Sequence, residues 1–375
     1  MDLSLTTEQR LLQDTLERCV RDYRHGPTST AGLAWAVPQG QELWRRLIGE
    51  LGLGLLVPKA GGEPLHVEHA LVLEVFGRHL LREPFLESVV VAGHLLAALG
   101  GERAETLLDE ISAAEAIAVL AWAEPQSSHD FADLALLASR DNNGWTLDGR
   151  KCLVRSAACA SHFLVVARTS GRPGDAQGLS LFLLPKDTPG LSLNEYPCVD
   201  GGHAADLQLD RVRLDASALL GEEGAVFSHL ERLRDIAVAG ACAQARGLLG
   251  EMLEQTRAHV GQRRQFGQSL AGFQVVQHRL VDMYLHVLKA GSASLLATPS
   301  LDTPGSGQAA SAAQVVMASA CRFVGQSAVQ LHGGMGMSNE IAISHYFRRA
   351  TALEREFGSR DFHLVRYNAL QPLAP

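Results

Sequence analysis

The chain has 375 residues, of which 46% are hydrophobic and 20% are charged, and its mean hydropathy is +0.04. This balance is that of a globular protein, and it excludes a mostly disordered chain, a collagen and a coiled coil. The net charge is −8 at pH 7, and no run of lysine and arginine is long enough to form the basic face of a nucleic-acid-binding protein. We therefore expect no nucleic-acid partner.

The cysteines and the N-terminal segment bear on the compartment. Six cysteines are scattered along the chain without a CxxC pair, a pattern that favours neither a zinc site nor a disulfide scaffold. The segment MDLSLTTEQRLLQD is charged within its first ten residues, unlike a signal peptide, and no apolar run reaches membrane-spanning length. The sequence thus predicts a cytoplasmic protein with no metal site and no membrane insertion.

The N-terminal part of the chain, residues 1–115, is predicted to be an α-helical domain. Thr6 and Gln9 form a capping-box pattern at the start of a helix. In segment 42–63, leucines recur at four-residue spacing until Gly52, Gly54 and Pro58 stop the helical pattern. Together with the apolar segments that follow, this pattern indicates a bundle of four or five helices.

Residues 116–222 are predicted to be a β domain. Seven short apolar segments are separated by turn signals, among them Asp-Asn-Asn-Gly at 141–144, which favours a tight hairpin. Strands at this spacing are typical of a compact β-barrel or sandwich.

Residues 223–375 return to helical periodicity and form the third predicted domain. One predicted helix carries a stripe of small residues, which allows another helix to cross it closely. A second predicted helix has one apolar face. We expect these two helices to form the core of an oligomer. We expect a break in the helical pattern at 291–308. The stripe comprises Ala239, Ala243 and Gly247, and the apolar face includes Phe273, Val276 and Leu280.

Four segments in this order resemble the acyl-CoA dehydrogenase family: LWRRLIGELGLGLLVPKAGGE at 43–63, LAWAEP at 120–125, RRQFGQSLAGFQ at 263–274 and QLHGGMGMSNEIAISHYFRRA at 330–350. The chain is most similar to the small-subunit type of pimeloyl-CoA dehydrogenase, whose β domain also opens with AEPQS. The resemblance implies an α+β fold with an N-terminal helical bundle, a central β-barrel or sandwich and a C-terminal four-helix bundle.

The resemblance also implies FAD, an acyl-CoA substrate that undergoes α,β-dehydrogenation, and electron delivery to an electron-transfer flavoprotein. In the family's tetramers each FAD lies across two subunits. One subunit holds the flavin ring and the substrate, and its neighbour contributes cofactor contacts. An arginine there can form charge-assisted hydrogen bonds with the pyrophosphate, and glycines allow close approach of the backbone. The matching residues here are Arg263, Phe266, Gln274, Gln330, Gly333 and Gly334.

The family's catalytic base has no matching carboxylate. Phe357 stands at the usual base position, and a phenylalanine cannot accept a proton. Glu356 is the neighbouring candidate, although its sequence context is more typical of a solvated charge. At the family's alternative base position the chain has Ala237, and the nearby Glu231 and Asp235 are expected to be surface charges at a helix start.

The residues that a family member keeps for its own flavin ring are also altered: Ala123, His129, Leu153 and Arg155 replace the usual types. The leading hypothesis is therefore one subunit of an α2β2 acyl-CoA dehydrogenase in lipid or steroid catabolism, whose partner carries the base. A homotetrameric enzyme that uses Glu356 or another carboxylate remains open, as does a flavin-free scaffold that binds acyl-CoA. The acyl group can be a steroid side chain, a dicarboxylic acyl group or a fatty acyl group.

Overall fold

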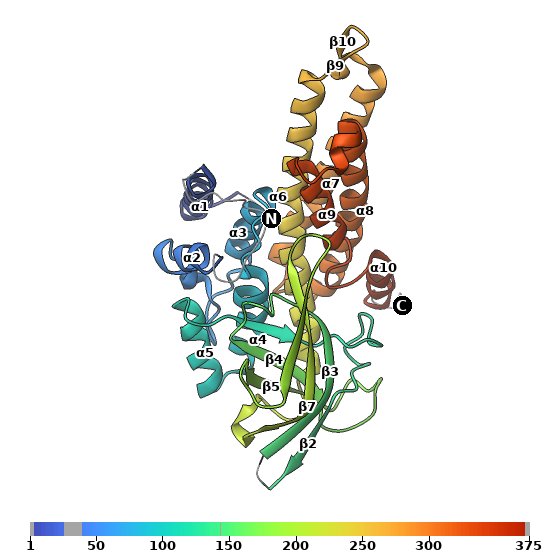
Figure 1. Cartoon of the computed structure of the whole chain (residues 1–375). Coiled ribbons are helices and arrows are strands. Elements are labelled where there is room, and N and C mark those ends of the chain that lie inside the picture. Colours follow the sequence, from blue (N-terminus) through green and yellow to red (C-terminus); the bar gives the residue numbers. More distant parts are fainter. Residues whose placement is uncertain (1–3, 26–39, 143, 372–375) are drawn as a thin grey trace.

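An N-terminal group of helices, one β-sheet and a C-terminal helical bundle follow one another in the computed structural model, which describes residues 4–25, 40–142 and 144–371. In Figure 1 the first helices lie beside the sheet, and the long C-terminal helices rise away from it as a bundle. The order of helices, strands and helices confirms the expected α+β class. No helix within the described ranges is long and apolar enough to cross a membrane.

The N-terminal region is made of short helices. The predicted capping box is confirmed, because the Gln9 amide donates to Thr6 Oγ1 at 3.2 Å and the Thr6 amide donates to Gln9 Oε1 at 3.0 Å. The helix predicted near 42–51 begins as α2, continues as the π-helical turn η1, and ends where Gly52 adopts a left-handed φ of 81°. The helical elements are α1 Thr7–His25, α2 Gly40–Arg45, η1 Arg46–Glu50, η2 Leu53–Leu56, α3 His66–Arg78, η3 Phe85–Ala92, α4 Gly93–Leu99 and α5 Glu102–Ser112.

The central region forms one eight-stranded sheet in the order β6-β7-β3-β2-β4-β5-β8, with β1 paired to β4. The predicted hairpin is confirmed by the antiparallel pairing of Asp141 with Gly144. Strand β8 was not predicted, because two residues are too few to show a period. The strands are β1 Ala118–Ala121, β2 Leu137–Asp141, β3 Gly144–Arg155, β4 His162–Arg168, β5 Leu179–Pro185, β6 Leu191–Pro197, β7 His203–Leu214 and β8 Leu219–Leu220, and a 3₁₀ turn, η4 Ala216–Ala218, precedes the last strand.

The C-terminal region is built on three long helices. The predicted break at 291–308 is partly wrong, because α7 runs through Gly291 to Ala297 and α8 begins at Ser306. A single glycine inside a helix costs only about 1 kcal/mol, which packing readily overrides. The elements are α6 Phe227–Gln262, β9 Arg264–Gln265, β10 Gln268–Ser269, η5 Leu270–Gly272, α7 Gln274–Ala297, η6 Thr298–Ser300, α8 Ser306–His332, η7 Gly333–Met337, α9 Ala342–Leu353 and α10 Arg360–Ala369.

The small-residue stripe of α6 packs inside the chain, against α3. A Cβ on Gly247 would lie 1.9 Å from the Glu74 carbonyl oxygen, and a Cβ on Gly77 would lie 1.8 Å from the Gln244 carbonyl oxygen. The two backbones therefore approach too closely for any side chain at either glycine. The prediction that this stripe belongs to an oligomer interface is wrong, because its partner is a helix of the same chain.

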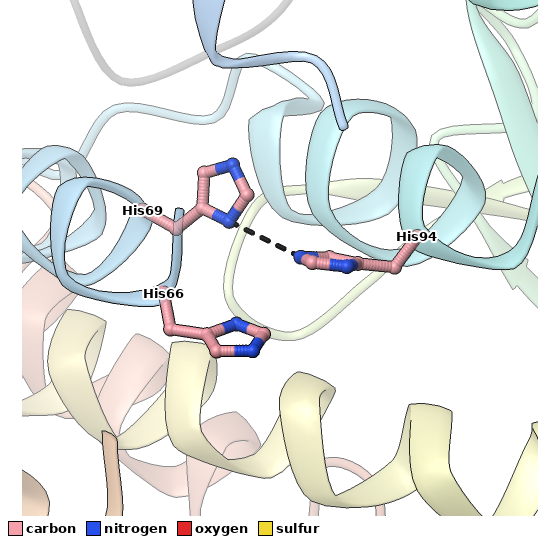
Figure 2. A group of neighbouring side chains, drawn as sticks. All are labelled: His66, His69 and His94. Carbon is pink, nitrogen blue, oxygen red and sulfur yellow. Dashed lines mark hydrogen bonds between the residues drawn. The ribbon is translucent and has the colours of Figure 1, made fainter. Parts of the chain in front are cut away.

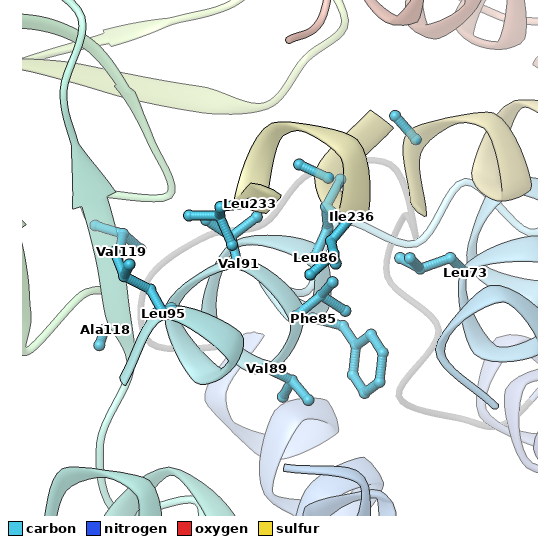
Figure 3. Close-up of a cluster of buried hydrophobic side chains, with 14 of the residues drawn as sticks. Leu73, Phe85, Leu86, Val89, Val91, Leu95, Ala118, Val119, Leu233 and Ile236 are labelled. Carbon is cyan, nitrogen blue, oxygen red and sulfur yellow. The ribbon is translucent and has the colours of Figure 1, made fainter. Parts of the chain in front are cut away.

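One hydrophobic core connects the three regions. Figure 3 shows buried side chains of α3, η3 and α4 in contact with β1 and with α6. Phe85, Val89 and Leu96 are no more than 1% exposed, as are Ala118 and Val119 of β1. This packing fixes the end of η3 against the sheet, next to the site described below.

Candidate functional site

Six charged side chains meet beneath the surface at the junction of the three regions. They come from the loop before η3, from η3 itself, from the end of β3, from the turn between β6 and β7, and from α9 and the turn after it. Three are positive and three are negative. The six, named the charge cluster from here on, are Arg82, Glu87, Arg155, Asp200, Arg349 and Glu356.

Two arginines bridge the carboxylates of the charge cluster. Arg155 Nη2 and Arg349 Nη1 each lie 2.9 Å from Asp200 Oδ2. The same two arginines contact Glu356, with Arg349 Nη1 at 2.9 Å from Oε2 and Arg155 Nε at 3.2 Å from Oε1. Glu87 Oε1 lies 3.6 Å from Arg155 Nε. Arg155 thus contacts all three carboxylates.

The charge cluster is largely closed to solvent. The side chains of Asp200, Glu356 and Arg349 are 2%, 8% and 11% exposed. Burial alone would raise the pKa of Asp200, but the Arg155 and Arg349 guanidiniums outweigh it and hold that pKa well below its usual range. Burial also raises the pKa of Glu87, which Arg155 opposes. Each charge is therefore stable only while its partners remain in place.

Glu356 lies inside the charge cluster and not at the surface. The prediction of a solvated charge is wrong, because both of its carboxylate oxygens face arginines and the side chain is buried. Phe357, at the family's base position, has a φ of 60° and packs against the hydrophobic core. A general base has to reach the α-proton of a bound substrate. Phe357 has no carboxylate, and the Glu356 carboxylate is ion-paired with Arg155 and Arg349.

Five members of the charge cluster, all except Glu356, line one side of a cavity whose other side is apolar. The apolar side is formed by Leu73, Phe76, Leu81 and Leu86. Gln244 also lines the cavity, and its Oε1 accepts a 2.5 Å hydrogen bond from Arg349 Nη2. The charges of the cluster are paired by proximity, although Arg155 Nε and both Glu356 carboxylate oxygens are buried without a hydrogen-bond partner among the described residues. The arrangement can anchor η3, β3 and α9 together. Within the described ranges each carboxylate of the cluster is ion-paired with an arginine, which disfavours its use as a general base.

The other altered residues lie apart from the charge cluster. Leu153 is 58% exposed and has a φ of 53°, where the pairing of β3 with β7 shifts register. The Ala123 carbonyl accepts a 2.8 Å hydrogen bond from the Cys152 amide. His129 packs against Phe362, with ring centroids 5.6 Å apart. The structure therefore does not bring these three residues together with Arg155 into one contact network.

The residues near the alternative base position are also engaged. Asp235 is buried at 5% exposure, and Arg366 Nη1 lies 2.6 Å from its Oδ1. Burial raises its pKa, while Arg366 and a hydrogen bond from Ser306 oppose the rise. Glu231 pairs with Arg366 at 3.2 Å. The prediction that both carboxylates are surface charges is wrong for Asp235, because α10 covers it.

The six residues expected to contact a cofactor lie together at the tip of the helical bundle. Arg263 directly follows α6, and Gly333 directly follows α8. The two helix ends are neighbours, since the rings of His259 and His332 stack with centroids 4.2 Å apart. In Figure 1 this tip, marked by β9 and β10, lies at the end of the bundle that points away from the sheet. The tip and the charge cluster are therefore separate sites.

The tip is open to solvent within this chain. Phe266 is 91% exposed, and Arg263, Gln274 and Gln330 are also exposed. Among the described residues, the Arg263 side chain has no hydrogen-bond or ion-pair partner. A Cβ on Gly333 or on Gly334 would meet no atom within 4 Å. The tip thus presents a cation and an uncovered backbone, both of which suit an anionic ligand.

An apolar face of α7 extends from the tip along the bundle. Its side chains recur at three- and four-residue spacing, the pattern of a helix that packs against another element. Each is between 40% and 56% exposed in this chain: Val281, Tyr284, Leu285, Leu288, Leu295 and Leu296. The predicted apolar residues Val276 and Leu280 are only partly exposed, and Leu280 packs against the core of the chain itself.

The sequence matches two family models, the acyl-CoA dehydrogenase middle domain over residues 119–212 and the acyl-CoA dehydrogenase C-terminal domain over residues 235–367. It is 27% identical to cyclohexane-1-carbonyl-CoA dehydrogenase of Geobacter metallireducens, over 92% of each chain. It is 28% identical to the human mitochondrial short-chain specific acyl-CoA dehydrogenase, over 84% of this chain and 81% of the relative.

Solved structures agree with these matches. Butyryl-CoA dehydrogenase from Megasphaera elsdenii superimposes with a TM-score of 0.87 at 22% identity, covering 98% of this chain and 99% of that one. The ChsE4-ChsE5 complex from Mycobacterium tuberculosis gives 0.85 at 24% identity, covering 100% of both chains. A variant of the Tcur3481-Tcur3483 steroid ACAD gives 0.81 at 26% identity, covering 97% of both. The chain therefore belongs to the acyl-CoA dehydrogenase family, whose members are oxidoreductases that act on the CH–CH group of acyl-CoA thioesters.

Proposed function

We propose that the chain is one subunit of a heteromeric, FAD-dependent acyl-CoA dehydrogenase, and that a related partner subunit carries the catalytic base and holds the flavin ring. The observation that carries the proposal is a contrast between two sites. The positions that would face this chain's own flavin and substrate include a self-neutralised charge cluster. The positions that would face a neighbour's cofactor are exposed, and the Arg263 side chain among them has no hydrogen-bond or ion-pair partner in the described part of the chain.

The charge cluster argues against a working flavin and substrate site within this chain. Arg155 stands where the resemblance places a hydroxyl residue that contacts the flavin, and it is tied to three carboxylates. Seating a flavin ring or an acyl group there would require the separation of buried ion pairs. Separation is costly, because removing one partner of a buried pair typically destabilises a protein by about 3–5 kcal/mol. The residues of the charge cluster therefore do not fit a flavin ring.

The tip has the chemistry that an FAD held mainly by a neighbour requires. Arg263 is exposed, and its guanidinium can donate charge-assisted hydrogen bonds to a pyrophosphate. Gly333 adopts a left-handed φ of 65° with open space around it, so a ligand can approach its backbone closely. FAD, when bound, accepts the hydrogen of the β-carbon as a hydride. This chain's own contribution is to hold the cofactor, through Arg263, Phe266, Gln274, Gln330, Gly333 and Gly334.

The partner is a second acyl-CoA dehydrogenase-like subunit in an α2β2 assembly. The exposed apolar face of α7 lies beside the tip, so a subunit that covers this face also reaches the cofactor contacts. The steroid ACAD at 26% identity, described by the paired names Tcur3481-Tcur3483, supports such an arrangement and a steroid or lipid acyl group. The likeness to the small-subunit type of pimeloyl-CoA dehydrogenase, and electron transfer to an electron-transfer flavoprotein, belong to the same proposal.

The test is to purify the chain alone and together with a second acyl-CoA dehydrogenase-like protein of the same organism that retains the family's base, and to measure flavin absorbance per chain. The proposal predicts almost no flavin on the lone chain, and one flavin for each pair of chains in an α2β2 complex. A lone chain that retains one flavin per subunit in a homotetramer would contradict the proposal. A complex without flavin would instead favour a scaffold that binds acyl-CoA.

A further inference from the structure

Three histidines that belong neither to the charge cluster nor to the tip converge in the N-terminal region. His66 and His69 lie one turn apart on α3, and His94 lies at the start of α4. One ring nitrogen of each lies within 4.8 Å of the other two. Figure 2 shows the rings facing one another in the space between these helices, with a ring nitrogen of His69 directed at His94.

The hydrogen bonds around the three rings leave nitrogen lone pairs turned inward. His69 Nε2 lies 2.8 Å from the Leu56 carbonyl oxygen, which can only accept, so Nε2 carries the proton and the Nδ1 lone pair points at His94 Nε2, 3.4 Å away. His66 Nε2 lies 3.4 Å from Asp302 Oδ1, and its Nδ1 is buried without a hydrogen-bond partner. His66 is 8% exposed, so this unpaired nitrogen cannot turn to bulk water.

The surroundings keep the rings neutral. Burial lowers the pKa of His69 to about 4 and that of His94 to about 2, and it also lowers the pKa of His66. The one arginine that influences both His66 and His94, Arg232, has its guanidinium 2.9 Å from Asp302. A neutral imidazole is the form that binds metal ions.

We propose that His66, His69 and His94 form a zinc-binding site. The ligands are Nδ1 of His66, Nδ1 of His69 and Nε2 of His94. His69 Nδ1 and His94 Nε2 lie 3.4 Å apart. This separation matches the value of about 3.3 Å between two ligands of a tetrahedral ion with Zn–N bonds of about 2.0–2.1 Å.

Two further features suit a metal site. Asp302 and the Leu56 carbonyl lie on the outer nitrogens of His66 and His69, as carboxylates and carbonyls do behind zinc-bound imidazoles. His66 and His94 also border a surface cavity with Arg232 and Asp302, which provides an entry path and room for a water as fourth ligand. The nearly parallel rings of His66 and His94, 24° apart, require one ring to rotate about its last torsion, which is soft for histidine.

The scattered cysteines do not indicate a zinc site, and the sequence pattern predicts no metal site. The signal available was the spacing of His66 and His69, which places both on one face of a helix. The third ligand lies 25 residues away from His69 along the chain and could not be found from spacing. A bound ion would link α3 to α4 and should raise the midpoint of thermal unfolding.

The experiment uses the full chain after treatment with EDTA and dialysis. Zn²⁺ is titrated in by calorimetry, and Co²⁺ is used as a spectroscopic probe. We expect one ion per chain, visible Co²⁺ absorption bands typical of tetrahedral coordination, and a higher unfolding midpoint with Zn²⁺. His94→Gln should weaken binding by about 100-fold or more, since loss of a supporting outer contact alone costs about 10–100-fold.

His278→Gln, at an exposed position on α7, is the matched control and should leave binding unchanged. Far-ultraviolet circular dichroism shows whether each variant is folded. His66→Asn is the second test variant and should weaken binding like His94→Gln. Equal Zn²⁺ affinity of the wild-type chain and both folded variants, or no bound ion in the wild type, would overturn the proposal. The outcome does not depend on flavin or on the partner subunit.

Discussion

Arg155→Met is the sharpest probe of the charge cluster. The substitution keeps a long unbranched side chain but removes the one guanidinium that, among the described residues, contacts Glu87, Asp200 and Glu356 together. Asp200 and Glu356 would keep the ion pairs with Arg349, and Asp200 would also keep the Gly202 amide. Glu87 would lose its guanidinium contact. The result is surplus negative charge in a place with little access to water.

The expected loss of stability is about 3–5 kcal/mol, the range found when one member of a buried ion pair is removed. The Arg155 side chain is 24% exposed, which favours the lower part of this range. An unfolding entropy of about 2.1 cal/mol/K per residue gives about 0.8 kcal/mol/K for this length. The midpoint of thermal unfolding should therefore fall by about 4–6 °C.

The assay is calorimetry or circular dichroism at pH 7, with Arg150→Met as the matched control. Arg150 lies on the same strand and pairs with Asp206, but its side chain is 52% exposed. The control should lose much less stability, because exposed ion pairs contribute little. If the two variants are equally stable, the charge cluster does not anchor the fold as we describe.

The stability difference between the wild type and Arg155→Met should depend on pH. The folded-state pKa of Asp200 lies below its usual value, so its ion pairs add stability above the unfolded pKa of about 3.9 and lose that contribution as the pH falls through the lower folded pKa. The part of the difference between the wild type and Arg155→Met that comes from Asp200 should therefore shrink as the pH falls below about 4. A difference that persists unchanged in acid would contradict this origin.

Three other expectations concern the buried Lys151, the tip and the histidines. In the wild type, Glu124 Oε1 lies 2.5 Å from Lys151 Nζ, and both side chains are buried. Lys151→Met leaves Glu124 without this cation and should lower the free energy of unfolding, measured by chemical denaturation, by about 3–5 kcal/mol. Arg263→Ala should lower flavin retention of the assembled complex by about ten- to hundredfold after dialysis, and Gln274→Ala should lower it less, since a hydrogen bond to a charged group is stronger than a neutral one. The pKa of His94 is lowered to about 2 in the folded state, so the ring stays neutral there while it becomes protonated in the unfolded state below about pH 6.5. This difference lowers the free energy of unfolding by about 2 kcal/mol at pH 5. In EDTA, His94→Gln should therefore lose less stability than the wild type between pH 7 and pH 5.

Local patterns in the sequence predicted the parts of the fold that depend on near neighbours. The capping box at Thr6, the hairpin closed by Asp141 and Gly144, and the long helix that carries the stripe around Ala243 are examples. The role of that stripe could not be predicted, because a row of small residues fits a helix of the same chain as well as one of a partner. Its packing against α3 is a tertiary property.

The charge cluster could not be found from the sequence for the same reason. Its members are spread from Arg82 to Glu356, and each has the local context of an ordinary surface charge. Glu356 was expected in solvent because a charged segment is usually exposed, yet the end of α9 turns it towards Arg155. The tip is the opposite case, since both of its segments carry recognisable motifs and only their proximity had to come from the fold.

The central claim is that this chain does not dehydrogenate acyl-CoA with its own pocket. The most direct measurement is turnover of acyl-CoA thioesters by the purified, partner-free chain, supplied with FAD and an artificial electron acceptor. Loss of a general base alone removes about 10²–10⁴-fold of rate, so we predict no measurable turnover until the partner is added. Robust turnover by the lone chain would contradict the account, and would require a base that the charge cluster does not provide.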